Sequence, residues 1–507
     1  MPLTDTLLLV VYGALMVVLC LFSFHAYLMV VLYRRRRAPA APPNAPAVWP
    51  AVTVQLPIYN ERYVVRRLIE AVCALDYPRG KLEIQVLDDS TDDTRSIVTE
   101  LVNQYRAAGI DITHVHRTDR TGFKAGALKA GLATAKGEFL AIFDADFVPP
   151  ADFLRRTLPH FRDAGVAVTQ TRWGHLNADY SLLTQAMAVG LDAHFVLEHG
   201  ARNAHSLFIN FNGTAGVWRK AAILDAGNWQ ADTLTEDVDI SYRAQLRGWR
   251  LVYLNDVVCD GEIPAEVQGL KNQQYRWAKG TIQTAKKLVP RIWASRTLSP
   301  LAKWEATTHL TNHIVFPVML LLFVLLWPIL HVKVTQDITG LYFAASSVFL
   351  VFAGSYPLFY AYAQREIYDD WKRRLLFVPL LMASAVGMSV VNSKAVFSAL
   401  LGRKSPFVRT PKYRLDDRAG SWRGKKYKGT KDATVLVELA LAAYSAAGIW
   451  YAASHGQVTA IPFMLLPCLG FGWIGGLSAM QALRLRAIPR IKAAMGSKGL
   501  ETAESLD

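Results

Sequence analysis

The stretch Phe139-Leu-Ala-Ile-Phe143-Asp144-Ala-Asp146 decides the fold of the central part of this 507-residue chain. Five consecutive apolar residues are typical of a buried strand, and two carboxylates follow where such a strand would end. Three similar runs precede it, separated by segments with helical spacing. This alternation predicts an α/β domain with a parallel sheet. The expected strands are 52–56, 82–87, 112–115 and 139–143, and the expected helices are 64–75, 94–107 and 124–135.

Acidic residues stand at the ends of two of these strands, where α/β sheets bind their ligands. Asp144 and Asp146 are two residues apart, so they can share one Mg²⁺ or Mn²⁺ ion, which prefers oxygen ligands. A simple turn is the alternative, because Pro149-Pro150 follows. Asp88 and Asp89 can accept hydrogen bonds from a nucleotide. The alternative there is helix capping, for which Thr91 or Asp93 precedes Arg95.

A third acidic group, Thr235-Glu236-Asp237, precedes an amphipathic helix. Thr235 is a natural cap, and acids in a first helical turn suit the helix dipole, so a purely structural role is one interpretation. The other is that a carboxylate beside bound phosphate acts as a general base.

A later helix carries Gln273, Arg276 and Trp277 on one face, because positions i, i+3 and i+4 are neighbours. Arginine suits contacts with phosphate, and the flat indole suits the apolar face of a sugar ring. The alternative is a tryptophan at a membrane interface. A basic loop, in which Arg117, Arg120 and Lys124 surround residues 121–123, resembles a diphosphate cradle, although solvated basic loops are common.

The composition excludes several classes of protein. With 52% hydrophobic residues the chain is not disordered, and its four cysteines are too far apart for a disulfide scaffold. The net charge is +15, from 56 Lys and Arg against 41 Asp and Glu. Nucleic-acid binding is not expected, because no base-reading motif accompanies this charge. The basic excess instead fits cytoplasmic loops beside a lipid bilayer.

Long apolar runs predict a multi-pass protein of the inner (plasma) membrane. Five spans, with residue 38 onward inside, place the strongly basic segment 402–432 in the cytoplasm, as the positive-inside rule requires. The more polar run 375–401 is then re-entrant or interfacial. The alternative is a sixth true span that is an exception to the charge rule. The expected spans are 7–33, 309–330, 340–363, 433–454 and 457–480. The expected parts are the helix 1–37, a cytoplasmic domain 38–300, membrane and interfacial helices 301–401, the loop 402–432, and a final helix pair with a basic tail, 433–507.

In their order and spacing, these motifs resemble the processive family-2 glycosyltransferases of the cellulose-synthase superfamily, over about residues 52–412. Finer matches resemble the cellulose-synthase-like mannan and glucan synthases. They are Leu87-Asp-Asp-Ser-Thr-Asp92, Arg120-Thr-Gly-Phe-Lys-Ala-Gly-Ala127, Phe211-Asn-Gly-Thr-Ala-Gly216 and Gln274-Tyr-Arg-Trp-Ala-Lys-Gly280. The resemblance implies a GT-A-type domain inserted between transmembrane helices.

The resemblance also implies a role for each motif. Asp237 corresponds to the catalytic base, and Asp144 with Asp146 to the diphosphate and metal pair. The implied nucleotide-binding residues are Asp88, Asp89, Lys124, Asp144, Gln273, Arg276, Thr410 and Lys412, and the implied acceptor-binding residues are Phe211, Asn212, Gly213, Thr214 and Trp277. One departure stands in the loop that the family writes Phe-x-Val-Thr-x-Lys. Arg409 replaces its valine between Phe407 and Lys412, which weakens the expected role of this loop in closing over a nucleotide.

The activity implied is that of an inverting enzyme that polymerises a nucleotide-activated hexose into a β-linked glucan or mannan and moves it across the membrane. UDP-glucose and GDP-mannose are both credible donors, with UDP-glucose slightly preferred. Mg²⁺ or Mn²⁺ is the implied cofactor, the growing β-glycan is the acceptor, and no cyclic-di-GMP module is expected. The first alternative is single addition of a sugar to a lipid such as ceramide or diacylglycerol. The second is a non-catalytic membrane scaffold or transporter.

Overall fold

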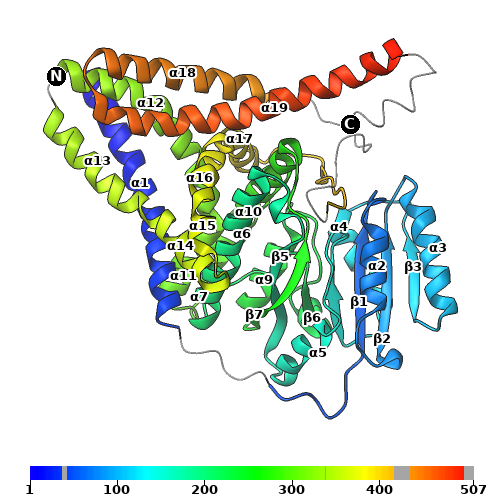
Figure 1. Ribbon diagram of the computed structural model, residues 1–507. Coiled ribbons are helices and arrows are strands. Elements are labelled where there is room, and N and C mark those ends of the chain that lie inside the picture. Colours follow the sequence, from blue (N-terminus) through cyan, green and yellow to red (C-terminus); the bar gives the residue numbers. More distant parts are fainter. Residues whose placement is uncertain (37–42, 337, 416–432, 496–507) are drawn as a thin grey trace.

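A seven-stranded mixed sheet forms the centre of the globular part in the computed structural model, which describes residues 1–36, 43–336, 338–415 and 433–495 (Figure 1). The strand order is β3-β2-β1-β4-β6-β5-β7. The strands are β1 (Val52–Ile58), β2 (Leu82–Asp88), β3 (Ile112–His116), β4 (Phe139–Ile142), β5 (Val166–His175), β6 (Gly216–Arg219) and β7 (Arg250–Gly261). Only β6 among these runs antiparallel to its neighbours.

The first four strands confirm the predicted parallel order, because β1 pairs in parallel with β2 and β4, and β2 with β3. Their connecting helices also lie where the periodicity placed them. These are α2 (Val65–Cys73), α3 (Thr94–Ala107) and α4 (Phe123–Thr134). No strand was predicted beyond residue 143, and β6 makes the complete sheet mixed. This strand has four residues, too few to show a strand period, and it returns antiparallel between β4 and β5.

The second half of the domain adds helices that carry site residues. A long helical run begins with α6 (Leu182–Ala193), continues through a π-helical segment (His194–His199) and ends with α7 (Gly200–Ala204). The strand β6 is followed by α8 (Lys220–Asp225), and α9 (Glu236–Leu246) precedes β7. The 28-residue α10 (Val267–Ala294) then leads toward the membrane part.

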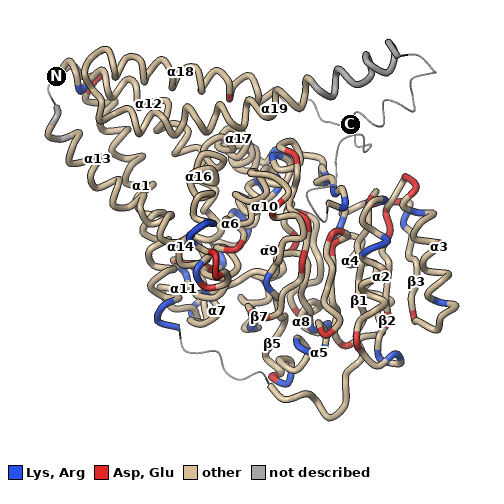
Figure 2. The backbone as a smooth tube through the Cα atoms, viewed as in Figure 1, with Lys and Arg blue, Asp and Glu red and all other residues tan. Residues whose placement is uncertain are grey.

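Among the residues that the structure describes, five helical stretches are long and apolar enough to cross a membrane, in agreement with the predicted spans. They are Leu3–Arg34, Pro300–Gln336, Tyr342–Ile367, Thr434–Ser454 and Val458–Leu483. The helices within them are α1 (Leu3–Arg34), α11 (Pro300–Thr311), α12 (Val315–Gln336), most of α13 (Thr339–Ala353), α14 (Ser355–Ile367), α18 (Thr434–Ser454) and much of α19 (Ile461–Met495). Figure 2 shows few charged residues on α12, α13 and α18. Each of these stretches overlaps one predicted span.

The run 375–401 forms a bent element rather than one straight helix. Residues Trp371–Gly387 and Ser389–Leu400 meet at 45°, so by length and composition they qualify as one broken span or as a re-entrant element. The bent element consists of α15 (Trp371–Arg374), α16 (Val378–Gly387) and α17 (Ser389–Leu400). It joins the two parts of the molecule, because α16 packs on α6 and on α19 while α17 packs on α10.

A buried ion pair also ties α10 to the membrane helices. The Lys271 ammonium lies 2.8 Å from a carboxylate oxygen of Glu438 on α18, and both side chains are almost completely buried. Such a pair fixes one arrangement of its two helices, because separating the charges would leave each of them buried alone.

Candidate active site

One pocket lies beyond the carboxyl ends of the central strands, as the strand-end acids predict. It collects residues from α4, α9, α10, the loop after β4 and the segment after α17. The sequence-predicted residues that line it are Asp89, Lys124, Asp144, Asp146, Asn212, Gly213, Asp237, Gln273, Arg276, Trp277, Thr410 and Lys412. Asp88, Phe211 and Thr214 do not line it. Groups far apart in the sequence thus converge on a single site.

Asp144 and Asp146 each hold a lysine ammonium. Lys124 Nζ lies 2.5 Å from Asp144 Oδ1 and also donates to the carbonyl oxygen of Gly213 at 2.8 Å. Lys412 Nζ lies 2.6 Å from Asp146 Oδ2. Burial lowers the pKa of Lys124, but the carboxylates of Asp144, Glu236 and Asp237 together outweigh it, and the pKa of this lysine is raised. The region therefore stabilises positive charge strongly.

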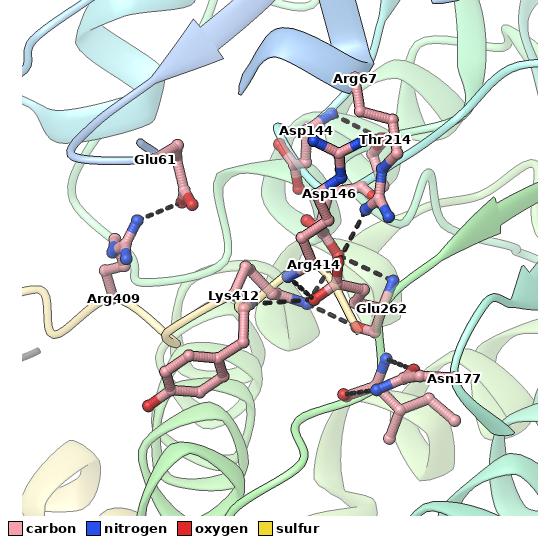
Figure 3. A network of polar contacts seen from close by, with 12 residues as sticks. Glu61, Arg67, Asp144, Asp146, Asn177, Thr214, Glu262, Arg409, Lys412 and Arg414 are labelled. Carbon is pink, nitrogen blue, oxygen red and sulfur yellow. Dashed lines mark hydrogen bonds and ion pairs between the residues drawn. The ribbon is translucent and has the colours of Figure 1, made fainter. Parts of the chain in front are cut away.

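Glu262, directly after β7, organises the segment that carries Lys412 (Figure 3). Its Oε2 accepts hydrogen bonds from the backbone N–H groups of Tyr413 and Arg414, and its carbonyl oxygen accepts one from Lys412. Its Oε1 lies 2.8 Å from the Arg67 guanidinium. Glu262 was not among the predicted site residues, although it follows a strand as Asp89, Asp144 and Asp146 do.

Asp237 lies in the first turn of α9 beside the loop at Gly213. A Cβ atom on Gly213 would stand 2.9 Å from Asp237 Oδ2, and Gly213 has φ +83°, so both space and backbone conformation require glycine. Burial, and then the negative charge of Glu236, raise the pKa of Asp237 to about 7. A carboxylate with this proton affinity is suited to accept a proton near neutral pH.

The structural roles proposed for the acidic motifs are partly excluded. Thr235 occupies the N-cap position of α9 but makes no capping hydrogen bond. At the start of α3 neither Thr91 nor Asp93 accepts such a bond, and Asp92 accepts one from the N–H of Thr94 instead. Capping therefore does not account for Asp88, Asp89 or the Thr235 hydroxyl.

The two aspartates after β2 point to different places. Asp89 lines the pocket and accepts two hydrogen bonds from the Arg117 guanidinium, at 2.8 and 2.6 Å. Asp88 is completely buried, outside the pocket lining, and faces His114 and His116. The structure thus brings Asp89 to the candidate nucleotide site and leaves Asp88 behind it.

The loop 211–215 lies beside the pocket. Phe211 is buried in the core against Trp218, and the hydroxyl of Thr214 accepts a hydrogen bond from the N–H of Asp144 at 2.9 Å. Asn212 reaches the pocket. Its amide group is held by two histidines of the π-helical segment, His199 at 2.8 Å and His194 at 3.1 Å. The histidines were not predicted, because residues five apart lie on different faces of an ordinary α-helix, and the π-helical segment is what brings both to Asn212.

The face of α10 predicted from helical spacing does line the pocket, with Gln273, Arg276 and Trp277. The Arg276 guanidinium lies 4.8 Å from the centre of the Phe407 ring, which stacks on Phe123 with its centroid 5.4 Å away. Burial lowers the pKa of Arg276. The segment after α17 thus closes over α10 and the start of α4.

Arg409, the residue that departs from the family's loop pattern, has a defined partner. Its Nη1 lies 2.6 Å from Glu61 Oε1 and donates to the carbonyl oxygen of Tyr59 at 3.1 Å. Both partners follow β1. Burial raises the pKa of Glu61 to about 7, against the effect of Arg409. The departure is therefore matched by an acid on the opposite wall of the pocket.

Comparison with known proteins agrees with this geometry. Residues 50–280 match the family described as "Glycosyltransferase like family 2". The chain is 41% identical over 271 residues to glucomannan 4-beta-mannosyltransferase 1 of Oryza sativa subsp. japonica, covering 51% of each protein. It is 43% identical over 249 residues to glucomannan 4-beta-mannosyltransferase 2 of Arabidopsis thaliana, covering 48% of this chain and 47% of that protein. The chain thus spans about half the length of the curated relatives it matches.

Among solved structures, the fold is similar to that of mannosyltransferase PcManGT from Pyrobaculum calidifontis, in complex with GDP-Man and Mn²⁺. The TM-score is 0.54 at 21% identity, and the match covers 78% of this chain and all of that one. At this identity the likeness concerns the fold, and it agrees with the predicted GT-A-type architecture. The expected resemblance is confirmed over residues 50–280, which match the model of a family-2 glycosyltransferase domain.

Proposed function

We propose that this protein is a membrane-embedded inverting glycosyltransferase that polymerises a nucleotide-activated hexose into a β-linked polysaccharide. The convergence of Asp89, Asp146 and Asp237 with the Gln273–Trp277 face of α10 in one pocket carries the proposal. Such a transfer needs groups that bind the nucleotide and the diphosphate, a proton acceptor, and an indole on which a sugar can stack. A scaffold or transporter does not need this combination of groups.

The donor that we propose to test first is GDP-mannose. The curated relatives are named as β-mannosyltransferases, and the solved structure of similar fold was described with GDP-Man. These names favour GDP-mannose over UDP-glucose, the donor slightly preferred from the sequence. They therefore favour a β-mannan or glucomannan product. The catalytic part of the chain, which holds the matched residues, then faces the cytoplasm, where nucleotide sugars are made.

In the proposed transfer, Asp237 accepts the proton of the acceptor hydroxyl as its oxygen attacks the anomeric carbon from the face opposite the diphosphate. Its pKa of about 7 lets it be ionised before the attack and protonated after it. Lys124 and Arg276 line the same pocket and stabilise the charge that develops on the departing diphosphate. Trp277 supplies a flat surface for the terminal acceptor sugar.

The two aspartates after β4 fit a divalent cation. Both line the pocket, and each already holds a positively charged ammonium on one carboxylate oxygen, so their surroundings favour a cation at this place. Asp144 and Asp146 would hold Mg²⁺ or Mn²⁺, which supplies charge stabilisation for the diphosphate when bound. Lys412 would then exchange its contact with Asp146 for one with the diphosphate.

Export of the polymer is the part of the proposal that depends on the membrane helices. The helix α10, which carries the proposed sugar-stacking face, packs on α17. The bent element that contains α17 also contacts α19, through α16. A growing chain that leaves Trp277 would pass these helices. Protein reconstituted with its catalytic domain outside the vesicles should produce polymer that is protected from added β-mannanase.

The decisive experiment incubates the purified full-length chain with labelled GDP-mannose or UDP-glucose and Mn²⁺ or Mg²⁺, and digests the products with linkage-specific hydrolases. We expect a polymer from GDP-mannose that β-mannanase degrades. A single labelled glycolipid would instead support the lipid-acceptor alternative. No nucleotide release from any donor in a wider panel would refute the proposed function.

A further inference from the structure

Two histidines and an aspartate meet at the ends of β2 and β3, behind the candidate active site. His114 Nε2 lies 2.9 Å from Asp88 Oδ2, and His116 Nδ1 lies 3.5 Å from the same oxygen. Within the described part of the chain, these residues form the one group of three whose possible ligand atoms all lie within 4.8 Å of one another. None of the three lines the pocket that holds Asp144 and Asp146.

The strand register explains why the three side chains meet. Residues two apart on a strand point to the same face, so His114 and His116 share one face of the edge strand β3. In the parallel pairing of β2 with β3, Asp88 stands directly opposite His116. The aspartate is completely buried, and the histidine side chains are 14% and 18% exposed. The group is thus built into the sheet yet open enough for one small additional ligand.

Hydrogen bonding at Thr99 on α3 fixes where the hydrogen of His114 sits. The Thr99 hydroxyl donates its one hydrogen to the Arg95 carbonyl at 2.9 Å, so toward His114 Nδ1, 3.3 Å away, it can only accept. Nδ1 therefore carries the hydrogen of neutral His114, and the lone pair on Nε2 faces the Asp88 carboxylate. Two acceptors that face each other are satisfied by a positive charge between them, either a proton on the imidazole or a metal ion, and direct metal binding distinguishes the two.

His116 also directs a ring nitrogen at the carboxylate of Asp88. His116 Nδ1 is buried and makes no hydrogen bond within the described structure, while it points at the same carboxylate oxygen. A carboxylate and two imidazole nitrogens, with a second-layer hydroxyl that orients one imidazole, form the arrangement typical of protein sites for Zn²⁺ and similar transition metals.

We propose that Asp88, His114 and His116 form a binding site for a transition-metal ion of the Zn²⁺ type, separate from the Asp144–Asp146 pair. Three protein ligands leave a fourth position for water. The ion would join the edge strand β3 to β2, directly before Asp89 on the pocket wall and before Arg117, which donates hydrogen bonds to Asp89. Its role would be to hold this wall, since the three ligands lie behind the pocket.

The test is direct metal binding by the full-length protein in detergent, in the background Asp144→Asn and Asp146→Asn, so that the predicted diphosphate site cannot contribute. Calorimetric titration with Zn²⁺ should show one equivalent bound, and Co²⁺ should give the visible absorption bands of a low-coordinate site. Both signals should disappear when His114→Ala and His116→Ala are added. His455→Ala, at an exposed position on the end of α18, is the matched control and should leave them unchanged.

A milder variant guards against misfolding of the double histidine variant. Thr99→Val keeps all three ligands and removes only the hydroxyl that orients His114, and it should weaken Zn²⁺ binding ~10-fold. Absence of binding in the Asp144→Asn, Asp146→Asn background would overturn the proposal. Unchanged binding after removal of both histidines would overturn it as well, and unchanged affinity in Thr99→Val would refute the role given to Thr99.

Discussion

Asp146 is buried and Asp237 half-buried in the same pocket, and their surroundings differ sharply. Asp146 accepts hydrogen bonds from the Lys412 ammonium and from the backbone N–H of Glu262. Asp237 has the neighbouring charge of Glu236, and its Oδ1 accepts one backbone hydrogen bond, from Val238. The first arrangement stabilises a permanent negative charge that attracts cations. The second raises the proton affinity, so the contrast separates a cation-binding end of the pocket from a proton-accepting end.

The substitution Asp237→Asn should break the proton-accepting end alone. An amide cannot take the acceptor proton, so kcat should fall roughly 10²–10⁴-fold, the range typical for loss of a general base. Donor binding, measured by titration with the nucleotide diphosphate, should change little because Asp146 is untouched. Asp146→Asn is the matched comparison, and it should weaken donor binding as well. Equal loss of donor binding in both variants would contradict the division of roles.

The substitution Glu262→Ala should disturb the cation-binding end through the segment after α17. It removes the acceptor of two backbone N–H groups and the partner of Arg67, and hydrogen bonds to charged groups contribute about 1.5–3 kcal/mol each. We expect kcat/KM for the donor to fall roughly 10–100-fold.

Glu138→Ala is the control for Glu262→Ala, because Glu138 forms an ion pair, with Arg219, through a mostly exposed side chain. Its steady-state kinetics should match those of the unchanged protein. A Glu262→Ala variant with unaltered kinetics would show that Lys412 does not depend on this clamp.

The pH dependence of the reaction tests the proton-accepting end of the pocket by itself. Because the pKa of Asp237 is raised to about 7, this base is lost by protonation as the pH falls through that value. The rate constant kcat/KM should therefore decrease about tenfold between pH 8 and pH 6 for a single essential base. Initial rates measured across this range with one donor would give the apparent pKa. A flat profile down to pH 5 would exclude Asp237 as a base with this proton affinity.

The parts of the site that were predictable from sequence are those built on the regular half of the sheet. Strands β1 to β4 are separated by helices with clear periodicity, so Asp89, Asp144 and Asp146 could be placed at one edge. Glu262 was missed because its strand, β7, pairs with β5 beyond the short antiparallel β6, and neither β5 nor β7 was assigned. A 12-residue strand that is followed directly by an acid was, however, a usable signal.

Other contacts depend on side-chain placement that no local pattern encodes. Asn212 was expected to face the acceptor, but its support by His194 and His199 requires the π-helical segment, which resembles an α-helix in sequence. Asp88 was grouped with Asp89 although adjacent residues at a strand end point to opposite sides. The ion pair of Lys271 with Glu438 joins residues 167 positions apart. Such pairs follow from the packing of the membrane helices on the domain.

The smallest expected effect concerns the one departure from the family's loop pattern. Restoring the pattern with Arg409→Val removes the partner of Glu61, whose pKa burial already raises to about 7. Without the guanidinium this pKa rises further, so Glu61 becomes neutral at pH 7.5 and no longer holds the segment that carries Lys412. We expect kcat/KM to fall only about 3-fold, which corresponds to about 0.6 kcal/mol, because protonation of Glu61 avoids an unpaired buried charge.

A double-mutant cycle with Glu61→Gln isolates that contact, because Gln preserves the shape of Glu61 and removes its charge. If the pair acts as a unit, the variant with both changes should be no slower than either single variant. Additive losses would mean that Arg409 and Glu61 act separately, with Arg409 contributing through its bond to the Tyr59 carbonyl. In that case Arg409 would position the loop after β1. Glu61 would then not explain why this chain tolerates arginine in place of valine.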